Sequence, residues 1–131
     1  MSRILALDYG EARCGCALSD PTGTLATPIG AVERPGSRRG LARIAELAAG
    51  HEVDRVLVGL PLTLSGEEGP QARVTREFAG RLEQLVGVPV ELYDERLTTR
   101  QAERSGGGSD ADSRAAAHLL ETYLAASGRP A

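Results

Sequence analysis

Apolar residues recur along the chain in short runs that are separated by turn residues. The first two runs are nearly continuous and predict buried strands over residues 3–9 and 13–19. A third run, over residues 24–32, contains Pro28, which suits an edge strand because such a strand needs fewer backbone donors. Since the connections between the three runs are short, they predict an antiparallel meander.

The rest of the chain alternates between helical and strand patterns. Ser37 can cap a helix, Pro70 suits the first turn of a second one, and Gly87 closes that second helix. A glycine-rich link over residues 105–109 precedes the last helix. The expected elements are a helix over 38–49, a strand over 53–60, a helix over 70–86, a strand over 88–93, a short helix over 98–104 and a helix over 111–126.

This order of elements predicts the fold class. Three adjacent strands followed by alternating helices and strands are typical of the ribonuclease H-like fold. We expect an α/β fold with a five-stranded mixed sheet, in which three antiparallel strands precede two parallel ones, flanked by helices. At 131 residues, the chain is expected to form a single domain over 1–131.

Composition removes several classes of protein. All 15 basic residues are arginine, and a Walker-type phosphate loop needs a lysine, so a P-loop nucleotide hydrolase is excluded. The net charge of −3 argues against tight, stable nucleic-acid binding, but less against a metal-dependent nuclease, whose acidic site a cation neutralises. No apolar run approaches the length of a membrane span, so we expect a cytoplasmic protein with no membrane partner. Cys14 and Cys16 share one strand face and are interpreted as core thiols.

Acidic residues stand where strands end or helices begin. Asp8 ends the first buried strand, where a carboxylate is costly to desolvate without a partner or a metal. Asp94 and Glu95 follow a later strand; side chains alternate there, so one of the two faces the site, and alternation alone does not say which. Asp112 lies near the start of the last helix, on the face expected to dock on the sheet and point towards the first strand, and Asp110 is interpreted as that helix's cap. Carboxylates gathered from separate elements suit a hard divalent cation.

Four stretches together resemble the YqgF/RuvX family, small ribonuclease H-like proteins described as pre-16S rRNA nucleases and as Holliday junction resolvase-like proteins. The resemblance covers nearly the whole chain. The stretches are Leu7-Asp8-Tyr9-Gly10-Glu11-Ala12-Arg13-Cys14-Gly15 with Ser19-Asp20, Val58-Gly59-Leu60-Pro61-Leu62 leading to Gly66 and Gly69, Asp94-Glu95-Arg96-Leu97-Thr98-Thr99, and Asp112-Ser113-Arg114-Ala115-Ala116 leading to Tyr123-Leu124.

The resemblance implies catalytic and metal-binding roles for Asp8, Glu95 and Asp112, with Mg²⁺ or Mn²⁺ as the cofactor. It also leads us to expect nucleic-acid contacts from Arg13, Arg96 and Thr98. Each residue has a plainer interpretation: Asp8 as a turn residue, Glu95 in an ion pair with a neighbouring arginine, and Asp112 as a helix cap. Arg13 and Arg96 either hold phosphates or pair with the acidic residues.

The implied activity is metal-dependent hydrolysis of phosphodiester bonds in structured RNA, at the 5′ end of pre-16S rRNA in ribosome biogenesis. The implied partner is pre-16S rRNA or a pre-ribosomal particle, and the expected state is a monomer or weak homodimer. The alternatives are a Holliday junction resolvase acting on branched DNA and a non-catalytic RNA-binding module in ribosome assembly or transcription. The chain departs from the family over residues 103–111, where a longer basic segment is usual.

A further alternative arises from Asp8-Tyr9-Gly10 and the following Arg13 and Gly15, which also resemble the phosphate loop of actin-like and sugar-kinase folds. Those folds place a nucleotide between two such domains. Because a chain of 131 residues holds one domain, this interpretation is the least favoured.

Overall fold

A computed structural model of the protein describes residues 3–95 and 108–126, with side chains given from residue 111 in the second range. The elements run strand, strand, strand, helix, strand, helix, strand, helix. Their bounds are β1 Ile4–Asp8, β2 Arg13–Ser19, β3 Ala26–Glu33, α1 Arg38–Gly50, β4 Arg55–Leu60, α2 Pro70–Val86, β5 Val90–Asp94 and α3 Gly108–Ala126.

The five strands form one mixed sheet in the order β3-β2-β1-β4-β5. β1 pairs antiparallel with β2, and β2 pairs antiparallel with β3. β4 pairs parallel with both β1 and β5. The predicted meander and the two following parallel strands are therefore confirmed, and Pro28 lies in the edge strand β3, beside a register shift.

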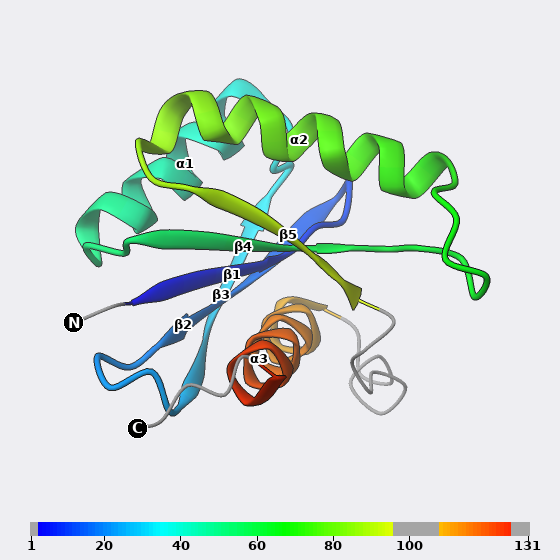
Figure 1. Cartoon of the computed structure of the whole chain (residues 1–131). Coiled ribbons are helices and arrows are strands. Elements are labelled where there is room, and N and C mark those ends of the chain that lie inside the picture. Colours follow the sequence, from blue (N-terminus) through cyan, green and yellow to red (C-terminus); the bar gives the residue numbers. More distant parts are fainter. Residues whose placement is uncertain (1–2, 96–107, 127–131) are drawn as a thin grey trace.

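Helices cover both faces of the sheet: α1 and α2 lie on one face and α3 lies on the other (Figure 1). Since side chains alternate along a strand, β1 supplies both layers. Leu5 and Leu7 pack towards α1 and α2, whereas Ile4 and Ala6 pack towards α3. All four are at most 2% exposed, so the sheet is buried on both faces around β1, as its continuous apolar run predicted.

The ends of the first two helices follow the sequence signals. The Ser37 side chain accepts a hydrogen bond from the Gly40 amide at 3.0 Å and caps α1. Pro70 is the first residue of α2, and Gly87 ends it in the left-handed conformation with φ 71°.

The start of the last helix differs from the prediction. α3 begins at Gly108, so Asp110 lies inside the first turn and is not the capping residue. Acidic residues are favoured inside the first turn as well as at the cap, because the backbone amides there have no partner within the helix and carry partial positive charge. The short helix predicted over 98–104 lies outside the described residues, as does most of the glycine-rich link.

A polar turn joins β2 to β3. The Asp20 carboxylate accepts hydrogen bonds from the backbone amides of Thr24 and Leu25, at 2.8 and 2.9 Å, and from the Thr22 hydroxyl. The Thr22 hydrogen bond contributes most, followed by the two amides, and together they lower the pKa of Asp20 from 3.8 to about 2.

Asp20→Ala is expected to lower the free energy of unfolding at neutral pH, because the turn loses its acceptor. The pKa of Asp20 is depressed in the folded state, so its contribution is complete above pH 3.8 and disappears as the pH falls through about 2. Urea unfolding across that window should show wild type and variant converging at the acid end. A difference that stays constant with pH would contradict this role for the carboxylate.

Within the two described ranges, the structure contains no helix that is both long enough and apolar enough to span a lipid bilayer.

Candidate active site

Asp8 is the last residue of β1 and is only 7% exposed. It lies in the row of β1 side chains that begins with Ile4 and Ala6, and therefore on the face covered by α3. Its Cα is paired with that of Gly15 on β2. The carboxylate is thus held at the end of the central strand, where the sheet meets the first turn of α3.

Two glycines flank Asp8 in the same row across the sheet. Gly15 is its partner on β2, and continuing the register from the Leu7–Val58 pair brings Gly59 of β4 to its other side. A Cβ at Gly15 would lie 1.9 Å from the carbonyl oxygen of Asp112, so the backbone of α3 occupies that space. A Cβ at Gly59 would lie 2.8 Å from Oε1 of Glu95. The two glycines therefore let Asp112 and Glu95 approach the row that holds Asp8.

Glu95 and Asp8 line the same open pocket, which has a volume of about 250 Å³. Tyr9, Pro61 and Thr75 contribute to its wall. Asp94 is not part of the lining: Tyr93 faces α3, so Asp94 points to the opposite side of β5. Glu95 therefore lines the pocket with Asp8 and Asp94 does not, which is the choice that strand alternation alone had left open.

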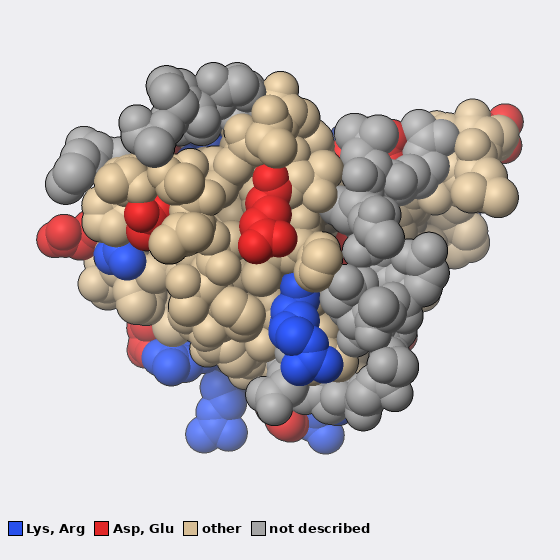
Figure 2. Space-filling view, turned by 90° about the horizontal axis from the view of Figure 1, so that it is seen from below, with Lys and Arg blue, Asp and Glu red and all other residues tan. Residues whose placement is uncertain are grey.

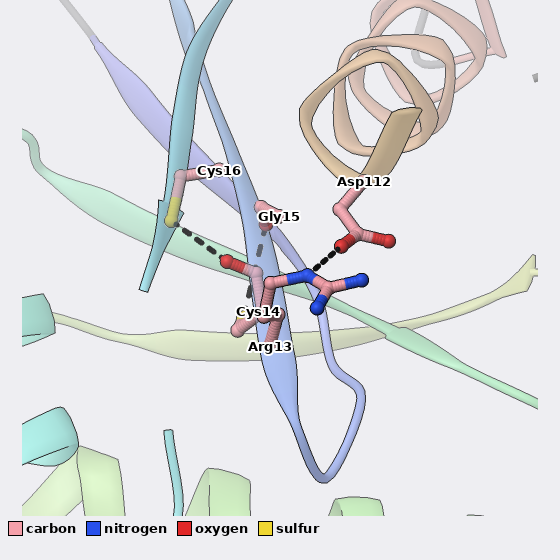
Figure 3. A network of polar contacts seen from close by, with 5 residues as sticks. All are labelled: Arg13, Cys14, Gly15, Cys16 and Asp112. Atoms are coloured by element: carbon pink, nitrogen blue, oxygen red, sulfur yellow. Dashed lines mark hydrogen bonds and ion pairs between the residues drawn. The ribbon is translucent and has the colours of Figure 1, made fainter. Parts of the chain in front are cut away.

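The backbone of Asp112 lies against Gly15, in the middle of β2, and its carboxylate is directed to Arg13, at the start of the same strand. Arg13 Nε donates a hydrogen bond to Asp112 Oδ2 at 2.9 Å, and this ion pair joins the start of β2 to the start of α3 (Figure 3). Both side chains are partly exposed, at 39% and 22%. The structure pairs Asp112 with Arg13 at the start of β2, and the expectation that Asp112 points towards β1 stays a prediction. Of the two roles left open for Arg13, the structure shows the pairing with an acidic residue.

The thiol of Cys14 is buried on the other face of the sheet from Asp8, in the layer covered by α1 and α2. Its pKa is raised well above the usual value by the hydrogen bond with Cys16, by burial, and then by the charges of Asp8 and Asp112. Both cysteines are reduced and buried in the layer under α1 and α2, as predicted.

The described residues contain no group of three or more acidic, histidine or cysteine side chains close enough together to hold a metal ion. Three acidic residues line one pocket: Glu11, which is exposed in the β1–β2 turn, and Asp8 and Glu95, which stand at the ends of β1 and β5. Mg²⁺ takes oxygen ligands from one or two carboxylates in proteins, with waters and phosphates completing its shell, and Asp8 and Glu95 offer such a pair. These two residues fit such an ion, and Asp112 would join them only by leaving Arg13. Arg96 and Thr98, the other predicted nucleic-acid contacts, lie outside the described residues.

Sequence reasoning treated Gly15 and Gly59 only as parts of motifs, although they create the space for the site. A glycine inside a strand often marks the close approach of another group, and that signal was available in both strands.

The chain is similar to known proteins over nearly its whole length. A family model described as "RuvX: Holliday junction resolvase" matches residues 2–126. A protein of Anaeromyxobacter dehalogenans strain 2CP-C named "Putative pre-16S rRNA nuclease" is 46% identical, covering 93% of this chain and 96% of its own. A Syntrophomonas wolfei protein with the same name is 38% identical, covering 93% of each chain.

Solved structures support the fold. Thermus thermophilus RuvC, in a complex with a Holliday junction substrate, aligns with a TM-score of 0.61 at 17% identity, over 98% of this chain and 97% of its own. The Fowlpox virus resolvase aligns with a TM-score of 0.55 at 11% identity, over 95% and 97%. At these identities the likeness shows the fold alone, and it confirms the ribonuclease H-like class predicted from the order of elements.

Proposed function

The chain belongs to the RuvX family, and from that premise we propose that it is a divalent-metal-dependent nuclease that hydrolyses phosphodiester bonds of structured RNA. The observation that carries this proposal is the pocket lined by both Asp8 and Glu95, which are 87 positions apart in the chain, with Glu95 lying over Gly59. Asp8 ends β1 and Glu95 follows β5, the two strands that flank β4, and their carboxylates supply hard oxygen ligands at an open surface. A purely structural role would not need both of them in a solvent-accessible pocket.

We assign the cation, Mg²⁺ or Mn²⁺, to Asp8 and Glu95, with Asp112 as the third carboxylate. Such an ion supplies Lewis-acid stabilisation of the negative charge that develops on a phosphate during hydrolysis. Arg13 holds Asp112 beside β2, and a phosphate that pairs with Arg13 would release Asp112 towards the pocket. Substrate binding and completion of the acidic site would thus be coupled through one arginine.

The natural substrate we propose is pre-16S rRNA, because the relatives that cover nearly the whole chain carry that activity in their names. The protein would then act in the cytoplasm on the precursor or on a pre-ribosomal particle, as a monomer or weak homodimer. Branched DNA is the second candidate, favoured by the description of the family model. A resolvase would need two copies facing a symmetric junction.

The proposal is tested by incubating the purified protein with precursor 16S rRNA and with a four-way DNA junction, in Mg²⁺, Mn²⁺ or EDTA. We expect the RNA to be cut with either metal and to stay intact in EDTA. Cleavage of the junction alone would replace RNA by branched DNA as the substrate. Metal-independent RNA binding without cleavage of either substrate would contradict the nuclease assignment and favour a binding module.

Gly59→Ala is expected to displace Glu95 with little damage to the fold. The added methyl group would meet Glu95 Oε1 at 2.8 Å and Leu119 Cδ2 at 3.1 Å, and both are ends of side chains that can shift. We expect a cost of about 1 kcal/mol in unfolding free energy, together with a fall in cleavage rate of about a hundredfold because a ligand of the cation is misplaced. Urea unfolding and single-turnover cleavage measure the two effects. Unchanged cleavage would show that the position of Glu95 over Gly59 has no functional role.

A further inference from the structure

A second groove, of about 670 Å³, lies between the end of β3 and the start of α1. Three arginines line it, Arg34 from the connecting loop and Arg39 and Arg43 from α1. The pocket lined by Asp8 and Glu95, called the acidic pocket from here on, is smaller, at about 250 Å³. The groove lined by arginines is therefore the larger of the two. A hollow lined by guanidinium groups suits an anionic ligand rather than a metal or an apolar molecule.

Two of the three arginines in this groove have no ion-pair partner among the residues that the structure describes. Arg43 forms an exposed ion pair with Glu46 at 3.4 Å. Arg34 and Arg39 are exposed and have no ion-pair partner among the described residues. Glu33 is the one acidic residue in the lining. The groove therefore keeps a net positive charge on a chain whose overall charge is −3.

The positions of these arginines do not favour folding. α1 has Arg38 and Arg39 in its first turn and no acidic residue there, although cations are disfavoured at a helix N-terminus. Arg34 adopts φ 46°, which is uncommon for a residue with a side chain, and its carbonyl accepts hydrogen bonds from the Ser37 amide and hydroxyl at 3.0 and 2.7 Å. A rigid loop thus fixes one arginine in a strained conformation, and such strain often accompanies a binding role.

The groove adjoins the acidic pocket at one edge of the sheet. The Arg34 amide donates to the carbonyl of Ala12 in the β1–β2 turn at 2.9 Å. Tyr9, which lines the acidic pocket, brings its hydroxyl to 3.4 Å from the position of a Cβ at Gly36, beside the groove. Figure 1 shows the β1–β2 turn and the β3–α1 connection on the same side of the molecule. Tyr9 and the β1–β2 turn therefore connect the lining of the acidic pocket to the loop that carries Arg34.

The opposite face carries no comparable basic surface among its described residues. Figure 2 views the molecule from the α3 side and shows charged side chains of both signs, separated by larger uncharged areas. The groove between β3 and α1, by contrast, gathers three arginines in one lining.

We infer that the groove lined by Arg34, Arg39 and Arg43 binds the phosphodiester backbone of the nucleic-acid strand whose scissile phosphate enters the acidic pocket. This inference rests on the proposed nuclease function and adds the path of the substrate. It also explains how an acidic chain can hold a polyanion, since a few local arginines provide the affinity while the overall charge opposes it. RNA and DNA share this backbone, so the groove serves either substrate.

The test is fluorescence anisotropy in EDTA, which separates binding from cleavage, with a labelled precursor rRNA fragment and a labelled four-way DNA junction. For the Arg34→Gln/Arg39→Gln variant we expect binding weakened about tenfold or more. The slope of log Kd against log salt should fall by about one for each arginine removed. Arg39→Gln alone should weaken binding while its melting temperature stays equal or rises, because a cation leaves the helix N-terminus. Loss of affinity for both probes assigns the groove to the shared backbone.

Arg114→Gln is the charge-matched control for Arg39→Gln, because Arg114 is exposed on α3, on the other face of the sheet. It should keep wild-type affinity and salt slope. If Arg34→Gln/Arg39→Gln binds both probes as wild type does, the groove is not a binding site, and metal-dependent cleavage would still stand on its own assay. If wild type neither binds nor cleaves either probe, the proposed function and this inference fall together.

Discussion

Asp8→Asn is expected to lower the cleavage rate by about a thousandfold or more, because losing the cation removes several kcal/mol of transition-state stabilisation. Asparagine keeps the size and shape of the side chain, so the end of β1 should remain folded. Asp8 is 7% exposed and lines the acidic pocket with Glu95, so its carboxylate is both held in place and open to a ligand. Single-turnover cleavage of precursor rRNA in Mg²⁺ measures the effect.

Asp94→Asn is the matched control. Asp94 precedes Glu95, ends β5 and faces away from the acidic pocket. Its cleavage rate should stay within about threefold of wild type. Far-ultraviolet circular dichroism and urea unfolding confirm that both variants are folded. Equal cleavage by Asp8→Asn and wild type would remove Asp8 from the catalytic site.

Gly15→Ala is expected to destabilise the protein by about 3 kcal/mol, at the upper end of what overpacking costs. The new methyl group would lie 1.9 Å from the Asp112 carbonyl oxygen and 2.9 Å from the Ser113 amide nitrogen. Both are backbone atoms of α3, so no side-chain rotation relieves the clash, and the start of the helix must move. Since that movement carries the backbone of Asp112 away from the row that holds Asp8, cleavage should fall together with stability.

Gly80→Ala is the control for the glycine substitution itself. Gly80 lies inside α2, and a Cβ there meets no atom within 4 Å. Alanine should therefore raise the unfolding free energy by about 0.5 to 1 kcal/mol through its helix propensity. Urea unfolding of the two variants gives opposite shifts if α3 lies on β2 as described. Unchanged stability of Gly15→Ala would contradict that packing.

The sheet could be predicted because its signals are local. Continuous apolar runs in β1 and β4 indicated strands that are buried on both faces, and Pro28 indicated an edge strand. Ser37 and Gly87 indicated the ends of helices. The start of α3 could not be predicted in the same way. Gly108 disfavours a helix by propensity, but a first turn depends little on propensity and gains from packing on β2.

The candidate site was predicted less completely because it depends on contacts between distant residues. Strand alternation limited the choice to Asp94 or Glu95, but only the space over Gly59 shows that Glu95 reaches Asp8. The ion pair between Arg13 and Asp112 joins residues 99 positions apart, and no local pattern reports it. The arginine groove was missed for a different reason. The chain has no lysine and its 15 arginines are spread along the sequence, so three arginines near α1 did not indicate a binding site.

The central proposal is that Asp8 and Glu95 hold one divalent cation, which Asp112 joins when substrate releases it from Arg13. Isothermal titration calorimetry of Mn²⁺ into the nucleic-acid-free protein tests it most directly, with Asp8→Asn, Glu95→Gln and Asp112→Asn compared against Asp94→Asn. We expect wild type and Asp94→Asn to bind equally, and Asp8→Asn and Glu95→Gln to lose at least about tenfold in affinity. Asp112→Asn should lose less, because Asp112 is paired with Arg13 before substrate arrives. Wild-type affinity in both Asp8→Asn and Glu95→Gln would contradict the claim.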